Sequence, residues 1–216
     1  RQFLAVIAGL LRGKLRPAAR LLAEAGHRAR ICVDSAPVLE RALAVRAGLG
    51  FIGKTGCLIH PRYGSYLFLG EIFTDLELPD GERTPDGCVE CSLCLKACPS
   101  DAFAGPRVLD AGRCLSTWTI EWRGDFSPDA PQLKGHLFGC DRCQEVCPFN
   151  REAPLSVEGD FRPRGPWFAP DPVRVAAMDE PEWDAATRGT PLRRARCDGL
   201  LRNAKRVLAE RQGPSS

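Results

Sequence analysis

The sequence lacks any apolar run that approaches the roughly 20 residues a membrane-spanning helix needs. It also lacks low-complexity tracts and tandem repeats, apart from one recurring cysteine motif. Apolar residues make up 44% of the chain, close to the globular average, which excludes general disorder. A length of 216 residues suffices for one sizeable domain or for two small domains that share a core. We therefore expect a folded protein without a membrane partner.

The first residue is Arg1 instead of Met, and no signal peptide precedes the folded sequence. We therefore expect an N-terminal segment to be missing. Eleven cysteines could indicate a disulfide scaffold if the protein were secreted, but their spacing indicates metal ligands instead. Because metal-ligating thiols persist best in a reducing compartment, we expect a cytoplasmic location.

Basic residues gather at the two ends of the chain. Residues 1–30 carry a net charge of +6 and residues 192–211 carry +5, whereas residues 31–191 carry −8. Basic faces of this size suit a polyanion such as RNA. The alternative is a pair of ordinary solvated helices, which the charge alone does not exclude.

The N-terminal third contains helix and strand signals in alternation. Apolar residues recur at helical spacing over residues 2–26, with an interruption at Pro17. Residues 29–33 read as a short strand, and Pro37 suits the first turn of a second helix.

Further along, residues 57–59 and 66–73 read as two strands joined by a turn. Residues 77–87 are rich in Pro and Gly and form the best candidate linker. We expect residues 151–172 to be an extended surface segment and residues 191–211 to form a basic helix or helix pair.

The strongest signal is a run of four cysteines, Cys88-x2-Cys91-x2-Cys94-x3-Cys98, followed by Pro99. In bacterial ferredoxins, three cysteines of such a run hold one four-iron, four-sulfur cluster and the fourth ligates a second cluster. A second group consists of Cys114, Cys140, Cys143 and Cys147, with Pro148 after the last. The crossed pattern predicts a first set (Cys88, Cys91, Cys94 and Cys147) and a second set (Cys98, Cys114, Cys140 and Cys143).

Zinc is the alternative occupant, because C-x2-C pairs also occur in zinc ribbons. Three cysteines at two-residue gaps and two C-x3-C-P endings favour clusters over zinc. Cys32, Cys57 and Cys197 remain outside both sets, and we expect them to be buried small hydrophobic residues.

The sequence upstream of these cysteines narrows the function. The stretch VDSAPVLERALAVRAGLGFIGKTG (33–56), then GSYLFLGEIF (64–73), followed by this cysteine layout, closely resembles the epoxyqueuosine reductase family. The similarity is specific from residue 32 to residue 148. It weakens towards GTPLRRARCDGLLRNAKRVL (189–208), which still resembles the RNA-facing tail of the family.

The resemblance implies a reductase that uses cobalamin and two four-iron, four-sulfur clusters to complete queuosine in tRNA. Its substrate would be tRNA carrying epoxyqueuosine, and its electrons would come from an external donor. We expect the chain to act as a monomer.

The resemblance also assigns roles to residues. Asp34 corresponds to the proton-donor aspartate, and Arg123 to a tRNA-contacting position. The remaining positions correspond to cobalamin contacts, and they are Asp34 itself, Leu58, Leu69, Phe73, Ser116, Cys140 and Asp141. Without the resemblance, Leu58, Leu69 and Phe73 could equally be core residues. Arg123 could be an ordinary surface arginine, and Asp34 could cap the next helix.

The implied chemistry agrees with these parts. Opening an epoxide to leave an alkene takes two electrons and two protons and releases water. Reduced cobalt can supply electron pairs, and low-potential clusters can refill it one electron at a time. A carboxylic acid in a partly apolar pocket, such as we expect around Asp34, can protonate the departing oxygen.

Two other functions share some of these features. A reductive dehalogenase has the same cofactors, but it is usually exported and uses a tyrosine where this family uses aspartate. The sequence has only Tyr63 and Tyr66, both near the expected turn. A ferredoxin-type electron carrier would need neither the 33–56 block nor a basic tail.

We expect an α+β architecture in three parts. Residues 1–76 would be part of a cobalamin-binding domain with a small antiparallel sheet. Residues 77–150 would be a ferredoxin-like double-cluster domain, and residues 151–216 a basic helical extension.

Overall fold

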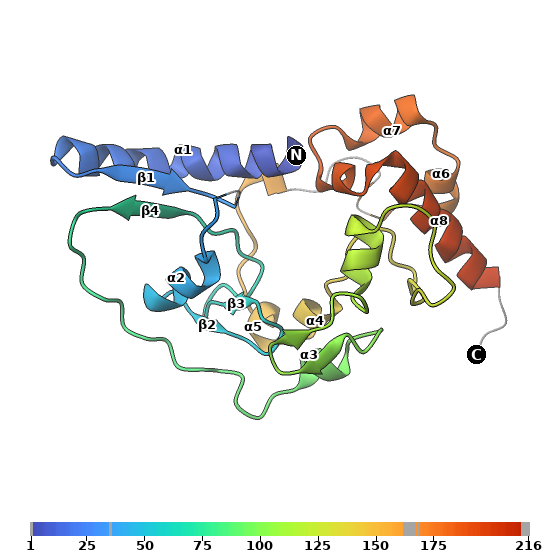
Figure 1. The fold of residues 1–216 in the computed structure, drawn as a ribbon, viewed down its shortest axis with the longest axis horizontal. Helices are drawn as coiled ribbons and strands as arrows, with labels where there is room; N and C mark the ends of the chain where they lie inside the picture. The colour runs from blue at the N-terminus through green and yellow to red at the C-terminus, as the bar shows by residue number, and fades with distance from the viewer. Residues whose placement is uncertain (1, 35, 162–166, 168, 213–216) are drawn as a thin grey trace.

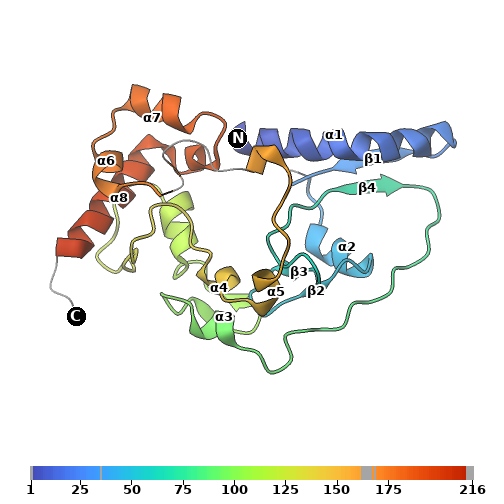
Figure 2. The same ribbon diagram turned by 180° about the vertical axis from the view of Figure 1, so that it is seen from behind.

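The computed structural model describes residues 2–34, 36–161, 167 and 169–212, with side chains from residue 8 onward. The fold is α+β, with short antiparallel strand pairs and helices at both ends (Figure 1). Helix α1 lies along the β1–β4 pair at one end, and α6, α7 and α8 gather at the other (Figures 1 and 2). The short helices α3, α4 and α5, which carry the cysteine motifs, lie between them. The α-helices are α1 (Gln2–Glu24), α2 (Glu40–Arg46), α3 (Leu93–Lys96), α4 (Arg142–Glu145), α5 (Pro148–Arg151), α6 (Pro172–Ala176), α7 (Glu180–Thr187) and α8 (Arg196–Gln212).

Helix α1 continues through Pro17, so the expected interruption there was wrong. Proline removes one helical hydrogen bond, but Pro17 lies on the exposed face, where water can solvate the freed carbonyl. The other face of α1 packs against β1 and β4. The helix ends where expected, with Gly26 in the left-handed region at φ +87°.

The strands form three two-stranded antiparallel sheets. Strand β1 (Ala29–Cys32) pairs with β4 (Glu71–Thr74), so that Cys32 lies opposite Glu71. Strand β2 (Phe51–Ile52) pairs with β3 (Leu58–Ile59), and β5 (Phe103–Gly105) pairs with β6 (Val108–Leu109).

The hairpin expected from residues 57–59 and 66–73 was therefore wrong. The turn closes on itself through a bridge between His60 and Gly64. Residues 66–70 form no strand, and β4 then reaches the strand that α1 supports. The helix expected from Pro37 starts three residues later, at Glu40.

The largest hydrophobic core lies in the C-terminal part. It joins Trp118, Leu133 and Leu137 to residues of α6, α7 and α8, including Val175, Trp183, Leu200 and Val207. The π-helical turn η1 (Thr117–Glu121) packs against α8, and so does the 3₁₀ turn η4 (Pro191–Arg194). A further 3₁₀ turn, η2, spans Gly159–Phe161.

This core includes the segment between Cys114 and Cys140. The C-terminal helices thus support the loop that carries the second cysteine set. The domain limits at residues 76 and 150 stay predictions. Among the described residues, no helix is both long and apolar enough to cross a membrane.

Candidate functional site

The structure brings the four thiols of the first set together. All four line one cavity of about 220 Å³, which no cysteine of the second set lines. Ile59 of β3 and Phe149 of α5 provide apolar walls to the same cavity. Burial raises the pKa of Cys94 and Cys147, and the other two thiols of the set raise both further. A bound cation would relieve this repulsion, because thiolates are the form that ligates metal.

The backbone leading into the first set is held in place by polar contacts. The Asp86 carboxylate accepts the Cys88 N–H at 2.8 Å, and the Lys54 ammonium donates to the Val89 carbonyl at 2.8 Å. Gly87 leaves no room for a side chain, because a Cβ there would lie 2.5 Å from the Phe149 ring. The four thiols therefore face a cavity with fixed walls.

The cavity distinguishes a cluster from a single ion. About 220 Å³ is several times the space of one water molecule, roughly 30 Å³. One tetrahedral zinc draws its four sulfurs to about 2.3 Å from the ion and leaves no such space. The donor set and the volume together fit a four-iron, four-sulfur cluster.

Two thiols of the second set, those of Cys114 and Cys140, lie near Cys143. Burial raises the pKa of its thiol to about 12, and nearby acidic groups, including Cys114 and Cys140, raise it as well. The Ser116 hydroxyl accepts the Cys140 N–H at 3.0 Å and so fixes this ligand loop to the turn after Cys114. Cys98 follows α3, which packs against α4, and its sulfur accepts the Ala102 N–H at 3.2 Å.

His136 contacts one thiol of the second set. One ring nitrogen lies 3.0 Å from the Leu133 carbonyl, and the side chain also hydrogen-bonds to the Cys140 sulfur. This bond raises the pKa of His136. Burial opposes ionisation of Cys140, but His136 and the Arg142 backbone N–H outweigh it, so the pKa of Cys140 is lowered. Nothing in the local sequence around His136 indicated this contact.

The turn between β3 and β4 docks onto the cysteine helices. Asn150 Oδ1 accepts the Ser65 N–H at 2.7 Å, and the Ser65 hydroxyl donates to Gln144 at 2.8 Å. Burial raises the pKa of the docked Tyr66 hydroxyl, and the nearby acidic groups Asp141 and Glu145, followed by Cys143 and Cys57, raise it further.

Sequence reasoning assigned neither Cys57 nor Tyr66 to this surface. Cys57 is also half-buried, whereas a buried residue was expected. Cys32 is buried as expected, but the same expectation was wrong for Cys197, which is half-buried among the C-terminal helices.

Asp34 lies just beyond the end of β1, as the sequence predicted. Its backbone is in the left-handed region at φ +49°, and its N–H donates to Glu40 Oε1 at 2.6 Å. The expected apolar surroundings are not present in the described part of the chain, where the Asp34 side chain is exposed. The preceding residue, Val33, is fully buried.

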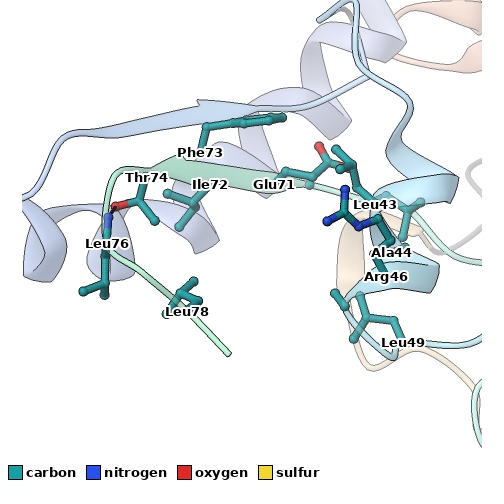
Figure 3. Close-up of a pocket in the computed structure, with 13 residues that line it drawn as sticks. Leu43, Ala44, Arg46, Leu49, Glu71, Ile72, Phe73, Thr74, Leu76 and Leu78 are labelled. Atoms are coloured by element: carbon teal, nitrogen blue, oxygen red, sulfur yellow. Dashed lines mark hydrogen bonds between the residues drawn. The ribbon is translucent and has the colours of Figure 1, made fainter. Parts of the chain in front are cut away.

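The expected cobalamin contacts fall on two surfaces. Leu69 and Phe73 line an open cavity of about 550 Å³ between β4 and α2, whose far wall includes Leu43 and Leu49 (Figure 3). Leu58 is only 5% exposed in β3, so it offers packing rather than an open contact.

The other expected contacts, Ser116, Cys140 and Asp141, lie at the second cysteine set. Asp141 is exposed and its carboxylate accepts the Gln144 amide at 2.8 Å. The turn that carries Tyr66 lies against this same surface.

Arg123 has a structural partner. Its guanidinium donates to the backbone carbonyls of Ile120 at 2.8 Å and of Arg194 at 2.9 Å, which ties the end of η1 to η4. Contact with RNA is therefore not needed to explain this arginine.

Four of the seven cations in residues 192–211 also make contacts within the protein. Arg193 pairs with Asp184, Arg194 with Glu121, and Arg206 with Glu210, at 2.7, 2.6 and 2.9 Å. Arg202 donates to three backbone carbonyls and lies over the Phe126 ring. Within the part of the chain that the structure describes, the tail's exposed cations without such a partner are Arg196, Lys205 and Arg211.

Comparison with known proteins agrees with this geometry. Residues 87–150 match the family described as the 4Fe-4S double cluster binding domain. An epoxyqueuosine reductase from Pseudomonas aeruginosa is 46% identical over 198 residues, which cover 90% of this chain and 55% of that protein. One from Escherichia coli is 41% identical over 172 residues, covering 79% and 45%.

Over about nine tenths of its length, the chain is similar in sequence and in fold to epoxyqueuosine reductases. The crystal structure of an epoxyqueuosine reductase with a tyrosine tRNA stem loop modified with epoxyqueuosine superposes with a TM-score of 0.80. It is 30% identical, and the match covers 94% of this chain and 54% of that one. A Bacillus subtilis epoxyqueuosine reductase, whose catalytic aspartate loop is swung out of the active site, superposes with a TM-score of 0.78 at 30% identity. That match also covers 94% and 54%. The chain thus spans about half the length of the family members it matches.

Proposed function

We propose that this chain is the electron-delivering half of a reductase that converts epoxyqueuosine in tRNA to queuosine. In this proposal the two cysteine sets hold two four-iron, four-sulfur clusters, and Asp34 is the proton donor. Residues 1–76 contribute to a cobalamin site, residues 77–150 hold the clusters, and residues 151–216 form the basic extension. The protein acts as a monomer with an external electron donor.

One observation carries the proposal, namely the course of residues 66–70. The segment starts at Tyr66, directly after Ser65, whose hydroxyl donates to Gln144 of α4, the helix that carries Cys143 of the second set. It ends at Gly70, where an added Cβ would lie 3.5 Å from Val33, the neighbour of Asp34. Four residue steps span at most roughly 13 Å. The segment therefore runs from the edge of the second cluster to the proposed proton donor within the reach of one cofactor.

The exposed side of this segment supports a large apolar partner. Tyr66, Phe68 and Phe73 are 52, 51 and 43% exposed. Exposed aromatic side chains are a feature of binding surfaces when they lie close together, and in this proposal Tyr66 and Phe68 of the segment and Phe73 of β4 serve that role. A corrinoid ring has the flat, apolar faces that such a surface would cover. The residues that would contact it here are Leu69 and Phe73 on one side and Ser116, Cys140 and Asp141 on the other, with Leu58 packed behind.

Cobalamin, when bound, would supply low-potential electron pairs, and the clusters would supply single electrons. The chain's own residues have separate tasks. Ser116 holds the Cys140 loop in place, and docking of Ser65 on Asn150 fixes the distance from that loop to Tyr66. Asp34 gives a proton to the epoxide oxygen. With a second proton and two electrons, that oxygen leaves as water and an alkene remains.

The substrate assignment rests on the relative that was solved with a modified tRNA stem loop. The exposed tail residues Arg196, Lys205 and Arg211 give this chain a matching basic surface.

The test uses the full-length parent protein, loaded with iron, sulfide and cobalamin and reduced. Nucleoside mass spectrometry should detect queuosine after incubation with tRNA that bears epoxyqueuosine. In Asp34→Asn, single-turnover product formation should fall roughly 10²–10⁴-fold, because the amide has no acidic proton to deliver. Iron content and the cobalamin absorption spectrum should stay unchanged. Near-native turnover in Asp34→Asn would remove this residue from the mechanism, since the amide cannot deliver a carboxylic proton.

A further inference from the structure

We propose that Glu40 is a positioning residue that latches the Asp34 loop through the Asp34 backbone N–H. This inference rests on the proposed role of Asp34 as proton donor. Glu40 acts through the backbone and has no part in the proton transfer itself.

The loop needs such a latch because its backbone is strained. Asp34 has φ +49°, in the left-handed region, which aspartate occupies more often than most side chains but which still costs free energy relative to ordinary backbone. Val33, the residue before it, is fully buried and anchors one side. After Asp34, the described residues 36–39 form no helix or strand. Without a second anchor, the strain would relax and the carboxyl group of Asp34 would turn away.

Glu40 supplies that anchor from a rigid element. It is the first residue of α2, which packs against β2 and β3. Its carboxylate accepts the Asp34 N–H at 2.6 Å, a short bond with a charged acceptor. The bond crosses the irregular part of the loop and joins the strand end to the helix. It thus fixes the peptide plane that leads into Asp34.

A second carboxyl group borders the latch. Glu71 of β4 lies near Glu40, and its Oε2 is buried without a hydrogen-bond partner among the described side chains. Burial and the Glu40 charge both raise the pKa of Glu71. A glutamate that only stabilised the start of a helix would serve better away from a second acid. The bond to Asp34 gives Glu40 a role in spite of this neighbouring acid.

The simpler explanation is that Glu40 only favours the positive end of the α2 dipole. Glu180 provides a matched control, because it is likewise the first residue of a helix, α7, and makes no bond to a loop residue in the described structure. Glu40→Gln is the conservative variant, since its amide oxygen can still accept the N–H.

Amide hydrogen exchange at Asp34 and single-turnover rate should be measured in the cofactor-loaded full-length parent. In Glu40→Ala, exchange should accelerate and product formation should fall, each roughly tenfold to hundredfold, as for the loss of a bond to a charged acceptor. The apparent KM for tRNA and the iron content should not change. Glu40→Gln should recover most of both losses, and Glu180→Ala should show neither.

Unchanged exchange at Asp34 in Glu40→Ala would overturn the latch. So would a rate loss in Glu40→Ala that Glu180→Ala reproduces. Because exchange is measured without turnover, the latch is tested even if the parent protein reduces no epoxyqueuosine, a result that would refute the proposed function alone.

Discussion

The crossed arrangement of the cysteine sets can be tested by pairs of substitutions. Cys88 and Cys147 are 59 positions apart in the numbering, yet both line the same cavity. Cys98 is close to Cys88 in sequence but does not line that cavity. Two double variants therefore distinguish grouping in space from grouping along the sequence. One replaces Cys88 together with Cys147, and the other replaces Cys88 together with Cys98. Alanine is preferred to serine, whose oxygen could still ligate iron.

The expected iron counts follow from which thiols share a cluster. Wild-type protein should hold roughly eight irons, and loss of any ligand should cost the four of one cluster. In the crossed arrangement, Cys88→Ala with Cys147→Ala damages one cluster and leaves about four irons. Cys88→Ala with Cys98→Ala damages both and leaves almost none. Grouping by sequence predicts the reverse for each pair.

The assay is iron and acid-labile sulfide per chain after anaerobic reconstitution, with electron paramagnetic resonance of the reduced samples. Cys197→Ala is the control, because this thiol packs among the C-terminal helices and should leave about eight irons. About four irons in the Cys88/Cys98 pair, together with almost none in the Cys88/Cys147 pair, would refute the crossed arrangement. Stoichiometric zinc without iron would refute the clusters altogether.

Two further predictions concern the C-terminal helices. Asn203 is fully buried and donates to two backbone carbonyls at 2.8 Å each. Asn203→Leu should therefore lower the free energy of unfolding, measured by urea denaturation, by roughly 2–5 kcal/mol. A loss below about 0.5 kcal/mol, within the range of ordinary surface changes, would show that the amide is dispensable. Replacing Arg196, Lys205 and Arg211 with alanine should weaken tRNA binding and flatten its dependence on the logarithm of salt concentration by up to about 2, because fewer counterions are released. The control Arg188→Ala removes a cation already paired with a carboxylate at 2.8 Å and should leave the slope unchanged; an equal effect in both variants would contradict this assignment of the RNA surface.

Local features of the sequence predicted local structure well. The periodic apolar residues of α1 and the stop at Gly26 are short-range signals, and the structure follows them. The effect of Pro17 was overestimated, because its cost depends on whether the freed carbonyl faces water or core. The sequence alone does not say which face of the helix turns outward at that point.

Strand pairing was the main error because it is decided at long range. The sequence places residues 57–59 and 66–73 as neighbours, which suggests a hairpin. In the structure β3 pairs with β2, whereas β4 pairs with β1, which packs against α1. The turn is closed by the bridge between His60 and Gly64, so strand pairing ends there and does not continue into residues 66–70.

The cysteine spacing fixes ligand order but not the neighbours of the ligands. His136, Cys57 and Tyr66 all border the second set, and nothing in their local sequence marks them. They arrive there through packing between segments that are distant in sequence. For the basic tail, charge counting overestimated the surface available to RNA. It does not reveal that arginines such as Arg202 donate to backbone carbonyls within the fold.

The contact between the β3–β4 turn and α5 is the point on which the proposed electron path depends. Gly64 has φ +71°, and a Cβ there would lie 2.0 Å from Asn150 Oδ1, so only glycine allows the turn to sit this close. Asn150 in turn donates from Nδ2 to the Gln144 carbonyl at 2.7 Å, which joins the turn to the helix that carries Cys143. Residues 66–70 begin directly after this joint, so their distance from the second set is fixed by the Asn150 side chain, which hydrogen-bonds to the backbone of both segments. A cofactor bound along that segment would therefore meet the cluster at a constant separation, as repeated one-electron transfer requires.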